Sequence, residues 1–163
     1  MTSGTTRPGR RPEVVVRRAV ARDARRLTRI VRGSRAYEGK YAAMVADHRV
    51  RPGYIEAHRV FVAVDRADGR VLGFYALLVD AAELDLMFVA DDAQGLGIGR
   101  LLVRHLCGEA RAAGLDRVRV VSHPPAEGFY RSTGARRTGT APANPPAVPW
   151  ERPELEFAVP SDA

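Results

Sequence analysis

The chain has 163 residues, of which 45% are hydrophobic, and its formal net charge is +7 at pH 7. This length and composition fit one domain that buries its own core without disulfides or a structural metal. Cys107 is the only cysteine, which excludes an intramolecular disulfide and any cysteine-based zinc or iron–sulfur site.

The same composition indicates where the protein is located and which classes of partner are not expected. A single cysteine favours a reducing, cytoplasmic setting, and we expect no metal site because the histidines have no ligand spacing. No apolar run approaches the roughly 20 residues of a membrane span, so a membrane partner is not expected. The arginines are spread along the whole chain, and Lys40 is the only lysine. That distribution argues against a nucleic-acid partner, for which we would expect a clustered basic patch.

The chain begins with a segment that is rich in Thr, Gly, Arg and Pro and has no apolar periodicity. We therefore predict a disordered tail over residues 1–12, one domain over 13–160 and a short tail over 161–163.

The first half of the domain predicts one strand, one helix and a segment with weaker signals. A β-branched run favours a strand at residues 13–19, and apolar residues at helical spacing favour a helix at 20–35 with Asp23 as a candidate N-cap. Two short helical patterns follow at residues 41–45 and 54–57.

The central region gives the clearest pattern. Apolar runs at residues 59–64, 70–79 and 82–89 predict a meander of three strands, the first two joined by a hairpin at 65–69. A glycine turn and a helix that closes at Gly114 come next.

The C-terminal region adds smaller elements, at residues 117–122 (strand), 125–132 (helix), 136–140 (weak strand), 142–149 (proline-rich loop) and 154–159 (strand). A strand, a helix and a strand in succession imply a right-handed crossover and a parallel pair. The fold class is therefore α/β (α+β): a single domain whose mixed central sheet has about six or seven strands flanked by about four helices.

The turn Gln94-Gly95-Leu96-Gly97-Ile98-Gly99 joins a strand to a helix. Its glycines allow a tight turn and present N–H groups at the positive end of the helix dipole, which predicts an anion site. A dinucleotide fingerprint would need glycine where Arg100 or Leu102 stands, and the Gly-Lys-Ser/Thr triplet of a P-loop is absent from the sequence. A turn that merely connects the two elements is the structural alternative.

Two motifs identify a resemblance. Gln94, Gly97 and Gly99 match the signature Gln/Arg-x-x-Gly-x-Gly/Ala of the GNAT superfamily of acyl-CoA-dependent N-acyltransferases. The segment 126–135 resembles the family's Ala-x-x-Phe-Tyr-x-x-x-Gly-Phe block, in the right order and separation. The chain departs from the family pattern at Asp91, where proline is usual, and at His123, where asparagine is frequent.

The resemblance implies a GNAT fold, acetyl-CoA as acyl donor, and direct transfer of an acetyl group to a primary amine in a ternary complex. It assigns to the cofactor site Phe88, Val89, Gln94, Gly95, Leu96, Gly97, Ile98, Gly99, Arg100, His123 and Phe129. Main-chain groups of Phe88 and Val89 would hold the pantetheine arm, and a main-chain N–H would polarise the thioester carbonyl.

The catalytic candidates are three. The resemblance places the Tyr130 hydroxyl near the cofactor sulfur, where it protonates the departing thiolate or stabilises it by a hydrogen bond; a core role for Tyr130 is the alternative. An ammonium must lose a proton before it attacks, so a base is needed. Glu83 and then Asp85, on one face of a strand, are the candidates, although a solvated strand face explains both equally well.

The resemblance places acceptor selection in residues 34–59 and 141–150. We expect Tyr37, Tyr41, Tyr54 and Trp150 to contact a small-molecule amine or a peptide acceptor, with core or surface roles as alternatives. A homodimer is a further expectation, since dimers are common in the family. The alternative function is a non-catalytic GNAT-shaped module that senses acyl-CoA or binds a partner.

Overall fold

The computed structural model describes residues 11–37 and 39–161. The predicted tails at 1–12 and 161–163 therefore lie almost entirely outside the described residues. The strands are β1 Val14–Arg18, β2 Arg59–Asp65, β3 Val71–Leu78, β4 Glu83–Val89, β5 Arg117–Val121, β6 Arg136–Ala141 and β7 Arg152–Ala158. The helices are α1 Ala24–Arg32, α2 Pro52–Ala57, α3 Ile98–Ala112 and α4 Glu127–Ser132. Short 3₁₀ turns lie at Ala21–Asp23, Arg35–Tyr37, Gly39–Met44, Asp91–Ala93 and Pro124–Ala126.

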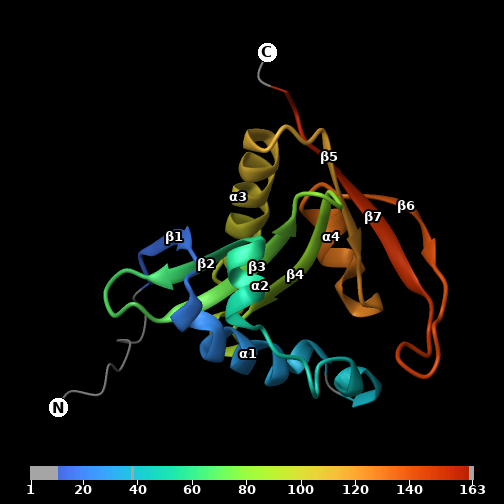
Figure 1. Ribbon diagram of the computed structural model, residues 1–163, viewed down its shortest axis with the longest axis horizontal. Helices are drawn as coiled ribbons and strands as arrows, with labels where there is room; N and C mark the ends of the chain where they lie inside the picture. Colours follow the sequence, from blue (N-terminus) through green and yellow to red (C-terminus); the bar gives the residue numbers. More distant parts are fainter. Residues whose placement is uncertain (1–10, 38, 162–163) are drawn as a thin grey trace.

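The strands form one seven-stranded sheet in the order β1-β2-β3-β4-β5-β7-β6. Neighbours are antiparallel except β4 and β5, which are parallel and joined by the crossover through α3. The predicted mixed sheet with about four flanking helices is thus confirmed. The sheet separates two hydrophobic layers (Figure 1): α1 and α2 cover one face, and α3 and α4 cover the other.

The start of α3 lies close against the sheet because β3 has a glycine there. A Cβ on Gly73 would lie 2.8 Å from the Phe88 carbonyl oxygen and 3.2 Å from the Ile98 side chain. Any larger residue would separate α3 from β3 and β4. Gly73 therefore fixes the first turn of α3 beside the end of β4.

The parallel strands β4 and β5 separate soon after they meet. Among the described residues they pair only at Glu83 with Arg119 and at Leu84 with Val120. Beyond Leu84, β4 continues along β3, whereas β5 stays paired with β7. The rest of β4 therefore has an edge that faces an opening in the middle of the sheet.

The predicted helix at residues 20–35 is shorter in the structure. A 3₁₀ turn replaces its first residues, and α1 ends at Arg32. Asp23 makes no side-chain hydrogen bond as the N-cap of α1. Its carboxylate instead accepts the Val20 N–H at 2.8 Å and two N–H groups of Arg17 at 2.9 and 3.0 Å. Asp23 thus closes the turn before the helix and ties it to β1.

Candidate active site

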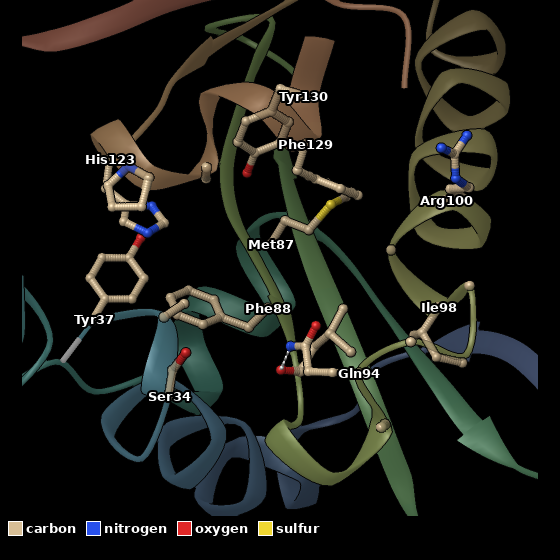
Figure 2. Close-up of a pocket in the computed structure, with 18 residues that line it drawn as sticks. Ser34, Tyr37, Met87, Phe88, Gln94, Ile98, Arg100, His123, Phe129 and Tyr130 are labelled. Atoms are coloured by element: carbon tan, nitrogen blue, oxygen red, sulfur yellow. Dashed lines mark hydrogen bonds between the residues drawn. The ribbon is translucent and has the colours of Figure 1, made fainter. Parts of the chain in front are cut away.

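A cavity of about 400 Å³ lies where β4 and β5 separate. Twelve of the predicted residues line it together: Tyr37, Phe88, Val89, Gln94, Gly95, Gly97, Ile98, Gly99, Arg100, His123, Phe129 and Tyr130. Figure 2 shows this wall, with the residues of β4 and the glycine turn facing those that follow β5. Leu96 belongs to the same turn, but it is 43% exposed and is not among the residues that line the cavity.

The glycine turn has the geometry of an anion site. Gly95 and Gly97 have φ values of +79° and +78°, a left-handed conformation that glycine adopts without strain. Gly97 is the N-cap of α3, and the first turn of this 15-residue helix has no acidic side chain. The N–H groups of Ile98, Gly99 and Arg100 precede the first helical hydrogen bond, which Leu101 donates to Gly97. They therefore remain available to a phosphate.

The edge of β4 that faces the cavity is formed by Met87 and Val89. The Ala90 N–H donates to the Leu72 carbonyl on β3 at 2.8 Å, so the main-chain groups of Phe88, two residues back, also point toward β3. Those of Met87 and Val89 point away from β3, toward the opening. The Gln94 side chain donates a hydrogen bond of 3.1 Å to the Val89 carbonyl (dashed line in Figure 2). The Val89 N–H and both main-chain groups of Met87 are then left facing the opening.

This alternation corrects one expectation drawn from the family. Phe88 lines the cavity with its side chain, and its main-chain groups belong to the β3–β4 ladder. The main-chain groups that face the cavity are instead those of Met87 and Val89. Main-chain groups alternate in direction along a strand, so the residues of β4 that face the cavity can be named only once the register with β3 is known.

Tyr130 lies on α4 with only 8% of its surface exposed, and it lines the cavity. Figure 2 shows its hydroxyl directed toward the middle of the cavity, above Met87. Burial, with a smaller contribution from Tyr37, raises the pKa of Tyr130 well above its ordinary value. The phenol therefore keeps its proton at neutral pH, as a hydrogen-bond donor must.

The side chains of His123 and Tyr37 stack against each other in the lining of this cavity, and we call this stacked pair the partition. Their rings stack with centroids 4.0 Å apart and planes 20° from parallel. Burial lowers the pKa of His123, while a hydrogen bond with the Ala36 main chain acts in the opposite direction. Burial also raises the pKa of Tyr37 to about 12. The partition is thus formed by two rings that are uncharged at neutral pH.

A second cavity, of about 160 Å³, adjoins the first. Both cavities are lined by Tyr37, Met87, Phe88, His123 and Tyr130. We call the larger one the donor cavity and the smaller one the acceptor cavity, after the roles that the sequence resemblance predicts for the residues around them.

Of the two candidate bases, Asp85 lines the acceptor cavity. Its carboxylate accepts a hydrogen bond of 2.5 Å from the Tyr54 hydroxyl. Burial and that hydrogen bond raise the pKa of Tyr54 far above its ordinary value. Glu83 lies where β4 still pairs with β5, and it is not among the residues that line either cavity.

Of the four predicted acceptor residues, Tyr37 is among the residues that line the acceptor cavity, and Tyr41, Tyr54 and Trp150 are not. Tyr37 lines it directly, and Tyr54 reaches it through Asp85. Tyr41 packs edge-on against both His123 and Trp150, with centroids 6.0 and 4.8 Å apart. Aromatic rings in contact with one another therefore connect Trp150, at the end of the proline-rich loop, to the partition.

Several lining residues, among them the polar Ser34 and Arg152, were not predicted from the sequence as site residues. Ser34 lines the donor cavity and Arg152 the acceptor cavity. Arg152 is one of many arginines spread along the chain, so its sequence position carries no signal. Among residues 11–37 and 39–161, no cluster of three His, Cys, Asp or Glu side chains is placed to hold a metal ion. Within those same ranges, no helix combines the length and apolarity needed to cross a membrane.

A mixed sheet that opens between its parallel strands, with a glycine-rich helix start at the opening, defines the fold of the acyl-CoA-dependent N-acyltransferases. Residues 56–134 match the family described as acetyltransferase (GNAT) domain. The chain therefore has the fold of the GNAT superfamily.

Solved structures agree with this fold. A GCN5-related N-acetyltransferase from Rhodopseudomonas palustris is 18% identical with a TM-score of 0.73, over 90% of this chain and 95% of that one. Phosphinothricin acetyltransferase from Sinorhizobium meliloti, solved with acetyl-CoA, is 22% identical with a TM-score of 0.67, over 90% and 88%. The ribosomal-protein-S18-alanine N-acetyltransferase from Escherichia coli is 18% identical with a TM-score of 0.67, over 92% and 96%. No curated protein sequence matches the chain.

Proposed function

We propose that the protein transfers an acetyl group from acetyl-CoA to a primary amine. The observation that carries this proposal is that Tyr130 lines both cavities and directs its hydroxyl toward the middle of the donor cavity, above Met87. A thioester in the donor cavity and an amine in the acceptor cavity would meet there. The acetyl-CoA bound to the Sinorhizobium meliloti relative supports the same donor.

The residues of the donor cavity fit the chemistry of acetyl-CoA. The N–H groups at the start of α3 would hold the pyrophosphate, and Arg100 adds positive charge in the same turn. The Val89 N–H and the Met87 main-chain groups would pair with the amides of the pantetheine arm or with the thioester carbonyl. A main-chain donor at that carbonyl would stabilise the negative charge that develops as the amine attacks.

The transfer needs two proton movements. The acceptor ammonium gives a proton to Asp85, and the free amine then attacks the thioester carbon. A C–N bond forms, the C–S bond breaks, CoA leaves as a thiolate, and the nitrogen loses its second proton to solvent water. The Tyr130 phenol donates a hydrogen bond to that sulfur. Because its pKa lies far above that of a thiol, Tyr130 stabilises the thiolate without transferring its proton completely.

The test is a binding and turnover experiment. Isothermal titration with acetyl-CoA measures donor binding, and a free-thiol assay measures CoA release over a panel of primary amines. We expect binding, and thiol release that depends on the amine. Binding without thiol release on any amine would instead support a non-catalytic sensor of acyl-CoA, and failure to bind acetyl-CoA would reject the proposal.

A further inference from the structure

The acceptor cavity is bordered by buried nitrogen atoms that have no hydrogen-bond partner among the described residues. These atoms are Nε of Arg152, Nε2 of His123 and Nε1 of Trp150. The first two belong to residues that line the cavity. Trp150 is linked to His123 through the ring of Tyr41. Buried polar atoms are normally paired, so a group of them around a cavity indicates a ligand that supplies acceptor atoms.

Arg152 also lacks a compensating charge. The one hydrogen bond that its side chain makes to a described residue is a long contact of 3.5 Å from a terminal nitrogen to the Pro142 carbonyl. No carboxylate of a described residue lies within ion-pair distance of it, although arginines elsewhere in the chain are paired, as Arg59 is with Glu109 at 3.1 Å. A partly buried guanidinium of this kind suits a carboxylate, which it can bind through two parallel hydrogen bonds.

The same cavity carries a negative charge at another point of its wall, on Asp85. One carboxylate and one unpaired guanidinium are complementary to a molecule that has both an ammonium and a carboxylate. The volume of about 160 Å³ lies below the roughly 300–1,000 Å³ of a drug-sized ligand site, so the molecule must be small. A polycationic acceptor would place positive charge beside Arg152, which is unfavourable.

We propose that the acceptor is a small amino acid, whose carboxylate binds Arg152 and whose amine is the group acetylated. This inference rests on the proposed function, because it names the substrate of the same reaction. In this arrangement Arg152 determines acceptor specificity, while Asp85 receives the proton of the amine. His123, at the partition, lies between the carboxylate site and the donor cavity.

The experiment compares acids with their neutral amides. Acetyl-CoA-dependent thiol release is measured with L-alanine and L-methionine and with L-alaninamide and L-methioninamide, each corrected for its fraction of free amine. We expect kcat/KM to be about tenfold or more higher for the acids. Arg152→Gln should remove that preference by raising KM for the acids, and Arg152→Lys should restore part of it. Arg104→Gln, an exposed arginine of α3, is the matched control and should keep the preference.

A second readout does not depend on turnover. Trp150 is the only tryptophan of the chain, so its fluorescence in CoA-saturated protein reports binding in its neighbourhood. We expect the two acids to change this fluorescence at concentrations about tenfold lower than their amides, and Arg152→Gln to abolish the difference.

The outcomes separate the two proposals. Amides that bind and react as well as the acids, with Arg152→Gln affecting both alike, would overturn the amino-acid inference while acetyl transfer stands. Thiol release with neutral or polycationic amines alone would overturn it in the same way. Failure of acetyl-CoA to bind would reject both.

Discussion

The ring of Phe129 lies so close to Gly99 that a Cβ at this position would be 2.8 Å from Cζ of the ring and 2.9 Å from Cε2. Phe129 belongs to α4 and Gly99 to the first turn of α3. The contact therefore joins the two halves of the donor cavity across the opening of the sheet. It explains why a glycine suits the last position of the turn in this chain, even though the residue has an ordinary helical conformation.

Replacing Gly99 with alanine should weaken acetyl-CoA binding. The added methyl group forces the Phe129 ring to move, and the ring borders the donor cavity. We expect the dissociation constant for acetyl-CoA, measured by calorimetry, to rise about tenfold, as a loss of roughly 1.4 kcal/mol.

The matched control is Gly108→Ala in the same helix, where a Cβ would meet no atom within 4 Å. Alanine in place of glycine within a helix stabilises it by about 0.5–1 kcal/mol, so this variant should melt higher and bind acetyl-CoA normally. Equal affinities for the two variants would show that the Phe129 contact does not shape the site.

Removing the Tyr130 hydroxyl should slow turnover without loss of donor binding. Tyr130→Phe leaves the ring in place but takes away the hydrogen bond to the leaving thiolate, so we expect kcat to fall about tenfold or more while the acetyl-CoA dissociation constant changes little. Because burial raises the pKa of Tyr130, the wild-type protein should show no loss of kcat from ionisation of this phenol up to about pH 9. Unchanged kcat in Tyr130→Phe would exclude the residue from the mechanism.

The two candidate bases can be separated by one pair of variants. Asp85 lines the acceptor cavity and Glu83 does not, so Asp85→Asn should reduce kcat/KM about 100-fold, and Glu83→Gln only slightly. Acetyl-CoA titration of both variants checks that the donor cavity is intact. A larger loss with Glu83→Gln would transfer the role of the base to Glu83, as the sequence reasoning first favoured.

The Arg17–Asp23 pair should contribute to stability in a pH-dependent way. Hydrogen bonds from Arg17 lower the pKa of Asp23 below its ordinary value of 3.8, opposed by burial. A carboxyl whose pKa is lower in the folded state stabilises the fold fully above its unfolded pKa and loses that effect as the pH falls through the folded pKa. Urea unfolding of Asp23→Asn should therefore show a loss of about 2 kcal/mol at pH 7 and a smaller loss near pH 3.

The control for this pair is the double variant. If the interaction is direct, Arg17→Gln combined with Asp23→Asn should cost less than the sum of the two single variants. Simple additivity at pH 7, or a loss that does not change between pH 7 and pH 3, would contradict the assignment.

The sequence alone determined the fold class and most of the donor cavity. The strands and the crossover helix are predicted by local hydrophobic periodicity, and the turn is predicted by the backbone conformations that glycine favours. Both signals depend only on residues that are neighbours in the sequence. The turn from Gln94 to Gly99 and the Phe129–Tyr130 block could therefore be recognised without knowing how they pack together.

Only the tertiary structure decided which groups meet at the reaction centre. Met87, and not Phe88, directs its main-chain groups toward the opening because the pairing with β3 fixes which residues of β4 face it. Asp85 and Arg152, far apart in sequence, face the same cavity because β4 and β7 lie on either side of β5. Charge complementarity with an acceptor is a relationship between distant residues in space, so neither composition nor spacing along the chain contains it.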